Sequence, residues 1–224
     1  MSESKKAQIR SMLIGIELYN PNNIEVLQEY LNEQCAENTY DLEANLAILR
    51  LYQFNTNKID KKVIINILLK ALTALPQTDF ILCKGLIDPN YFEEEDLEKN
   101  PDLKHVLELH KLLEICDFKQ FWSVLRTDPG VYLGIAGFDD AIRQFICHVV
   151  KITYQTIDKT TLCELLGGLD DSQITYWINC NKWKLEGDFV YISNQEELIK
   201  SKNIKEKIEF DSIARVVTAV AASK

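Results

Sequence analysis

The chain has 224 residues, 46% of them hydrophobic and 26% charged, with a formal net charge of −9 and an isoelectric point near 5.0. Such a chain is long enough to bury a core without disulfides or metals. Because neutralising phosphates dominates nucleic-acid affinity, the acidic balance argues against duplex DNA as a partner, and likewise against an anionic membrane surface. With only 8 glycines and 5 prolines, the composition favours helices over a turn-rich all-β fold.

The compartment is indicated by the N-terminal stretch and by the cysteines. Two lysines and an arginine near the N-terminus precede only a short apolar run without a small-residue cleavage site, so we expect no secretory signal. The apolar stretch from Val63 to Leu75 is too short and too interrupted to span a bilayer. We expect a cytoplasmic protein, with access to the nucleus left open, whose cysteines are reduced core residues. The six cysteines are Cys35, Cys83, Cys116, Cys147, Cys163 and Cys180.

Residues 1–132 are predicted to be a run of helices joined by short connectors. The helix that follows Asp60 has apolar positions around most of its circumference, which predicts a central helix flanked on several sides, and Pro76 should end it. Four polar residues are expected to cap helices at their N-termini. They are Asn20 (before Pro21), Asp41, Asp60 and Thr78.

The segment Asn90–Asn100 is acidic and aperiodic, so we predict an exposed loop there. The helical pattern resumes at Pro101 and again at Phe118. Successive short antiparallel helices are typical of a small right-handed solenoid of HEAT-like helical repeats, although the sequence holds no strict repeat.

The pattern changes after Gly130, Gly134 and Gly137, and residues 133–224 are predicted to form a second domain. We expect a helix over 138–152, a short strand over 154–157, a helix capped by Thr160, and a helix capped by Asp170 or Asp171. A β-hairpin over Trp183–Ile192 with a turn at Glu186–Asp188 follows. This order is that of a winged helix, and a helix over 204–217 with an Ala-rich tail should end the chain. The fold class is thus mainly α, with helical repeats over 1–132 and a winged helix over 133–224.

None of the candidate catalytic, metal-binding or phosphate-binding residues has the spacing along the chain that its chemistry requires. His105 and His110 are five residues apart and do not share a helix face, and Cys147 and His148 are neighbours that point about 100° apart on a helix. The cysteines lack zinc-knuckle spacing, the glycines lack the lysine of a phosphate loop, and the acidic run 93–96 lacks the ligand spacing of a calcium loop. We therefore expect no enzyme activity, no cofactor and no metal.

The predicted winged helix raises the question of nucleic-acid binding. Its second helix, over 172–183, has no arginine and only Lys182, with Asp170 and Asp171 at its start, so major-groove reading is disfavoured. An RNA-binding regulatory module stays open as the alternative, because Lys200, Lys202, Lys205 and Lys207 could form a basic patch near the C-terminus.

Long segments of the chain resemble the K-subunit family of eukaryotic translation initiation factor three, within the PCI-type scaffold proteins. The resemblance implies a non-catalytic scaffold subunit of a complex that binds the small ribosomal subunit. It also implies contact with other subunits of that complex, the L subunit foremost. The segments are NPNNIEVLQEYLNEQCAENTYDLEANLAILRLYQFN (20–55), ILLKALTALPQTDFILCKGLID (67–88), GFDDAIRQFICHVVKITYQTID (137–158), LGGLDDSQI (166–174) and KIEFDSI (207–213).

The hairpin supplies the candidate partner interface. It ends a small sheet, so one strand should leave backbone N–H and C=O groups unpaired, and a neighbouring chain can add a strand there. Phe189, Val190, Tyr191 and Ile192 are all apolar or aromatic, yet only alternate residues can pack inward. Two alternatives follow: the segment 204–217 covers the outward residues, or another subunit does.

Overall fold

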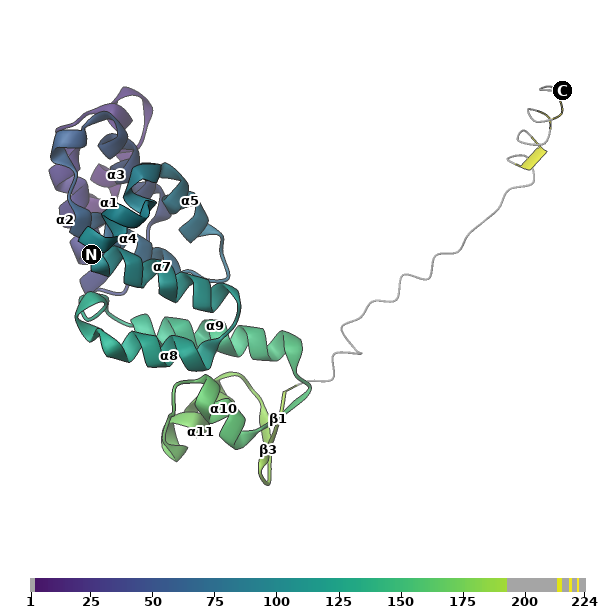
Figure 1. Cartoon of the computed structure of the whole chain (residues 1–224). Helices are drawn as coiled ribbons and strands as arrows, with labels where there is room; N and C mark the ends of the chain where they lie inside the picture. Colours follow the sequence, from purple (N-terminus) through teal and green to yellow (C-terminus); the bar gives the residue numbers. More distant parts are fainter. Residues whose placement is uncertain (1–2, 193–212, 215–217, 219–220, 222–224) are drawn as a thin grey trace. The chain divides into compact units, whose positions relative to one another are not determined.

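The computed structural model describes residues 3–192, 213–214, 218 and 221, and it divides the chain into two compact units, 1–193 and 194–224. The first unit is mainly helical, with a small three-stranded sheet near its C-terminal end (Figure 1). The predicted helix over 204–217 and the four lysines at 200–207 fall outside the described residues, apart from the helical pair 213–214.

The α-helices of the first unit are α1 Glu3–Met12, α2 Asn23–Ala36, α3 Leu42–Phe54, α4 Lys61–Thr73, α5 Asp79–Leu86, α6 Glu94–Lys99, α7 Pro101–Glu114, α8 Phe118–Thr127, α9 Phe138–Thr153, α10 Lys159–Leu165 and α11 Asp171–Cys180. Four 3-10 helices join them: η1 Gly15–Tyr19, η2 Thr56–Lys58, η3 Pro89–Phe92 and η4 Pro129–Val131. The strands are β1 Thr156–Asp158, β2 Lys184–Glu186 and β3 Phe189–Tyr191.

Helix α4 is the centre of the helical region, as predicted. It packs against α2, α3, α5, α7 and α9 (Figure 1). Consecutive residues Ile67, Leu68 and Leu69 are all fully buried, so the helix has apolar neighbours on more than one face. Burying a leucine or isoleucine side chain contributes about 1.5–3 kcal/mol, so these three residues together stabilise the helical region substantially.

Two of the four predicted caps are confirmed and two are wrong. The Asp41 carboxylate accepts a hydrogen bond from the Ala44 N–H, and Asp60 accepts one from the Lys62 N–H. Thr78 precedes α5 but makes no side-chain cap hydrogen bond. Helix α2 starts only at Asn23, because Asn20 and the residues after it first form a turn closing η1.

The prediction of an exposed loop over 90–100 is wrong, since the segment holds the end of η3 and all of α6. The acidic residues Glu94, Glu95 and Asp96 occupy the first turn of α6, where the helix dipole favours negative charge. Lys99 in the last turn lies 3.3 Å from Asp96. These charged residues, which interrupt the apolar pattern of the sequence, thus favour the short helix α6.

After α9 the elements follow the predicted order of strand, helix, helix and hairpin. Strand β1 begins two residues later than expected, because α9 continues to Thr153. Helix α10 is capped by Asp158 rather than by Thr160, whose own N–H donates to the Asp158 carboxylate. Helix α11 begins with a capping box formed by Asp170 and Gln173.

The end of α10 is fastened to the helical region through three successive carbonyl oxygens. Trp122 Nε1 donates to the carbonyl of Leu165 at 2.8 Å, Arg143 Nε donates to Leu166 at 3.2 Å, and Arg126 donates to Gly167. The contacts of Trp122 and Arg126 cross the predicted boundary between 1–132 and 133–224, whereas Arg143 and Leu166 both lie in 133–224. All three contacts lie within one compact unit. The boundary itself stays a prediction.

Candidate partner interface

The sheet has the strand order β1-β3-β2, with both pairings antiparallel. Strand β3, which carries the candidate interface residues, therefore lies in the middle and pairs on both sides. The hairpin has one strand at a free edge, as expected, but that strand is β2, and the outer edges of the sheet belong to β1 and β2. The apolar strand β3 is central because β1, which precedes α10 in the chain, also pairs with it.

The predicted alternation along β3 is present. Val190 is fully buried and Ile192, just beyond the strand, is also buried. Phe189 is 55% exposed and Tyr191 39% exposed, so both aromatic rings lie on the outward face. Of the four candidate residues, only these two are accessible to another molecule.

The register shows what surrounds the two aromatic residues. Phe189 lies between Asp158 on β1 and Glu186 on β2, whereas Tyr191 lies between Thr156 and Lys184. Residues paired across a sheet share a face, so the outward face is an aromatic pair bordered by charged and polar side chains. That composition suits a protein surface with apolar groups and a lysine or arginine near the position of Phe189.

Strand β2 is the exposed edge next to this face. Its residues are all exposed, and Leu185 at its centre is 44% exposed. A two-residue turn, with Gly187 at a φ of +61°, is closed by Glu186 and Phe189. Because hydrogen-bonded and non-hydrogen-bonded pairs alternate in an antiparallel ladder, the Leu185 N–H points away from β3 toward the free edge.

The residues weighed as catalytic candidates are dispersed. His110 stacks on Phe80 with ring centroids 3.8 Å apart, and burial lowers the pKa of this histidine. Burial raises the pKa of the Cys147 thiol to about 12, while its neighbour His148 is exposed. In the part of the chain that the structure describes, no group of His, Cys, Asp or Glu is arranged to hold a metal ion. The described helices are all too short or too polar to cross a bilayer.

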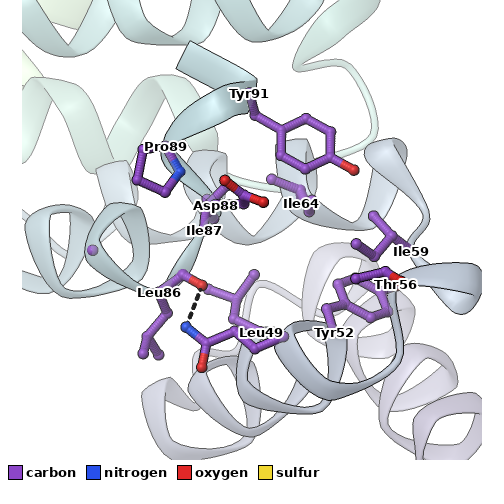
Figure 2. Close-up of a pocket in the computed structure, with 12 residues that line it drawn as sticks. Leu49, Tyr52, Thr56, Ile59, Ile64, Leu86, Ile87, Asp88, Pro89 and Tyr91 are labelled. Atoms are coloured by element: carbon purple, nitrogen blue, oxygen red, sulfur yellow. Dashed lines mark hydrogen bonds between the residues drawn. The ribbon is translucent and has the colours of Figure 1, made fainter. Parts of the chain in front are cut away.

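A hollow of about 260 Å³ lies in the helical region, between α3, the start of α4 and the segment from α5 to η3 (Figure 2). Figure 2 shows Leu49, Tyr52, Ile64 and Tyr91 around it. Two of its polar side chains have partners: Gln53 Nε2 donates to the carbonyl of Leu86 at 2.8 Å, and Asp88 caps η3. The hollow can accept an apolar side chain but offers no reactive pair. Sequence reasoning missed it because its walls come from separate segments.

Comparison with known proteins places the chain among relatives of similar length. The CSN8/PSMD8/EIF3K family matches residues 58–203. The protein named eukaryotic translation initiation factor 3 subunit K in Homo sapiens is 47% identical over 220 residues, covering 98% of each chain. Proteins of the same name are 47% identical in Bombyx mori, over 96% of this chain and 95% of the other, and 45% identical in Danio rerio, over 96% of both. The resemblance predicted from the sequence is confirmed, and the chain belongs to the CSN8/PSMD8/EIF3K family.

Proposed function

We propose that the chain is a non-catalytic scaffold subunit of the translation initiation factor three complex. In this role it takes part, in the cytoplasm, in binding the small ribosomal subunit and in starting protein synthesis. The observation that carries the proposal is the 47% identity to human initiation factor 3 subunit K over 98% of both chains. The dispersed histidines and cysteines are consistent with a protein that works through contacts.

The proposal includes two finer features of the fold. Helices α2 to α8 form HEAT-like repeats, a reading supported by the packing of α2 on α3, α4 on α5, and α7 on α8. The elements from α9 to β3 form a winged helix, a reading supported by two helices between β1 and the hairpin and by the antiparallel three-stranded sheet.

The test of the function is affinity purification of the tagged full chain from a eukaryotic cell extract, followed by mass spectrometry. We expect the other subunits of initiation factor three, the L subunit foremost, together with proteins of the small ribosomal subunit. Recovery of proteasome or signalosome subunits in their place would assign the chain to another complex and contradict the proposal.

The partner surface belongs to the same proposal: the β2 edge and the outward rings of Phe189 and Tyr191 contact a neighbouring PCI-type subunit. Unpaired backbone N–H and C=O groups at the edge of a sheet promote aggregation unless they are covered. A strand added by a neighbouring chain forms hydrogen bonds with them. The aromatic pair beside the edge adds apolar area to a contact that backbone hydrogen bonds would align. The helical face around the hollow in Figure 2 is the second choice.

The burial and strand position of each residue determine which substitutions test this surface without unfolding the sheet. Val190 is buried in the central strand, so Val190→Pro would disrupt the sheet itself. Leu185→Pro instead removes an N–H that faces the free edge, and Phe189→Asp places a charge on the outward face. We expect the double variant to keep its circular dichroism spectrum and to lose most of its co-purifying subunits.

The matched control is Phe54→Asp, which charges an exposed aromatic residue of α3. This variant should co-purify like the unmodified chain. If the control loses the complex and the sheet variant keeps it, the interface lies on the helical face and not on the sheet.

An RNA-binding winged-helix regulatory module is the alternative function. Helix α11 has acidic residues at its start, Asp170 and Asp171, and no basic residue in its last turn. We therefore expect negligible binding of duplex DNA at physiological salt. Fluorescence anisotropy with labelled duplex DNA and single-stranded RNA measures this, and submicromolar affinity that falls steeply with added salt would favour the alternative.

A further inference from the structure

Lys70 on α4 is a buried cation without a counter-charge. It is 1% exposed, and its chain neighbours Leu69 and Ala71 are fully buried. Its ammonium group forms neither a hydrogen bond nor an ion pair with any residue that the structure describes, but the group is not sealed from solvent, because it borders a pocket. A buried ammonium costs several kcal/mol when no partner compensates for its lost hydration. An anion that enters the pocket beside this lysine would therefore gain an ion pair with a group that has no other partner.

The lysine lines a pocket of about 510 Å³ at which four parts of the first unit meet. Thr73 extends the wall along α4, and Asn38 and Tyr40 come from the connection between α2 and α3. Helix α9 and helix α11 complete the pocket. Its volume lies in the range of small-molecule sites, which is about 300–1,000 Å³.

Three other polar side chains of the pocket already have partners. Tyr40 donates its hydroxyl hydrogen to Asp79 Oδ2 at 2.9 Å, and Thr73 donates to the backbone carbonyl of Lys70 at 2.6 Å. The Asp140 carboxylate pairs with Arg143 at 3.0 Å. Among the residues that line this pocket, Lys70 is the one whose charge is uncompensated.

The Cys35 thiol near Lys70 does not supply it with a counter-charge. Burial lowers the pKa of Lys70, and the Cys35 thiol, whose own pKa is raised by burial, is the one group among the described residues that acts against this shift. A thiol that stays protonated is a poor counter-ion. The pocket thus holds one positive charge, with the aromatic side chains Tyr176 and Trp177 of α11 on its wall.

We infer that this pocket binds a single carboxylate group carried on an apolar or aromatic stem, with the Lys70 ammonium as its ion-pair partner. One ammonium balances one carboxylate, whereas a phosphate would bring nearly two charges next to the Asp140 carboxylate. The stem would pack against Tyr176 and Trp177. None of the residues that line the pocket belongs to β2 or β3, so the inference goes beyond the proposed subunit contacts.

The first test is titration of the isotope-labelled full chain with phenylacetate, followed by nuclear magnetic resonance. We expect chemical-shift changes at α4, α9 and α11, and none with the neutral analogue phenylacetamide or with inorganic phosphate at the same concentration. Lys70→Met keeps the apolar stem and removes the charge, and it should weaken phenylacetate binding at least about ten-fold. The thermal midpoint of this variant should be unchanged or higher, because an unpaired buried charge has been removed.

Lys62→Met is the matched control, since Lys62 lies on the same helix and is exposed. It should leave phenylacetate binding unchanged. Equal binding by the Lys70→Met variant, or equal shifts with phenylacetamide or phosphate, would overturn the inference. If Lys70→Met does not fold, the unmodified chain still decides: phenylacetate should slow acylation of Lys70, measured by mass spectrometry, but not of Lys62.

The same acylation measurement distinguishes the sources of the carboxylate. The tagged chain is labelled in cell extract before and after dialysis. Protection of Lys70 that dialysis removes identifies a small carboxylate metabolite, and protection that survives identifies a carboxylate on a bound macromolecule. If Lys70 is protected in neither state, the pocket has no natural ligand in the extract and the inference fails.

Discussion

The helical region and the sheet differ in how completely they satisfy their own surfaces. In the helical region the backbone pairs within each helix, and some buried polar side chains also pair: Gln34 Nε2 donates to Asn45 Oδ1 at 3.0 Å, both residues being fully buried. In the sheet, β2 is exposed throughout and the central strand turns Phe189 and Tyr191 outward. The unpaired backbone edge of β2, which has no equivalent along the helices, is the physical reason for proposing the sheet as the partner surface.

The largest expected effect is a loss of stability on substitution in the core of the helical region. Leu68→Ala in α4 should lower the free energy of unfolding by about 2–5 kcal/mol, because a fully buried leucine is replaced by a cavity. Phe189→Ser on the outward face should change it by only about 0.5 kcal/mol. Urea unfolding followed by circular dichroism measures both. A loss for Phe189→Ser as large as that for Leu68→Ala would mean that the ring stabilises the isolated fold rather than a contact with a partner.

A smaller effect concerns the joint between the two regions. Gly167 has a φ of +95°, and a methyl group added there would lie 2.9 Å from the Trp122 ring, so Gly167→Ala combines backbone strain with a clash. We expect it to lower the free energy of unfolding by about 2–4 kcal/mol. Gly168→Ala is the matched control, because its φ is +73° but nothing lies within 4 Å of the added methyl group.

The control should lose only about 1–2 kcal/mol, the cost of the left-handed backbone alone. Equal losses in the two variants, measured by urea unfolding, would show that Trp122 yields to the added methyl group.

The smallest expected effect is a pH dependence of the stability that Asp170 contributes at the start of α11. The pKa of Asp170 is held below its usual value of 3.8, first by the hydrogen bond from the Gln173 N–H and then by that from Ser172. Since the folded-state pKa is the lower one, the stabilisation is complete above about pH 4 and is lost as the pH falls through the folded value. The Asp170→Asn variant should therefore have a lower thermal midpoint of unfolding than the unmodified chain at pH 6, and the difference between the two midpoints should shrink toward pH 2.5. A difference that does not change with pH would contradict this.

Local patterns in the sequence predicted the central position of α4, the caps at Asp41 and Asp60, and the hairpin with its inward Val190. These features depend on residues close together in the chain. The middle position of β3 was not predictable in this way, since it depends on pairing with β1 more than thirty residues earlier. The Lys70 pocket was missed for the same reason, because its walls come from four distant segments and one buried lysine in an apolar helix gives no sequence signal.

The position of β3 also bears on how the chain folds during its own synthesis. Both pairings of the sheet involve β3, and β3 is the last of the three strands to be made. Helices α2 to α8 make their main contacts among themselves and can pack as they emerge, since domains fold as units from the N-terminus. Strands β1 and β2 have no partner in the sheet until Phe189 to Tyr191 have left the ribosomal tunnel. The surface proposed for joining other subunits is therefore completed after the helical region that carries it.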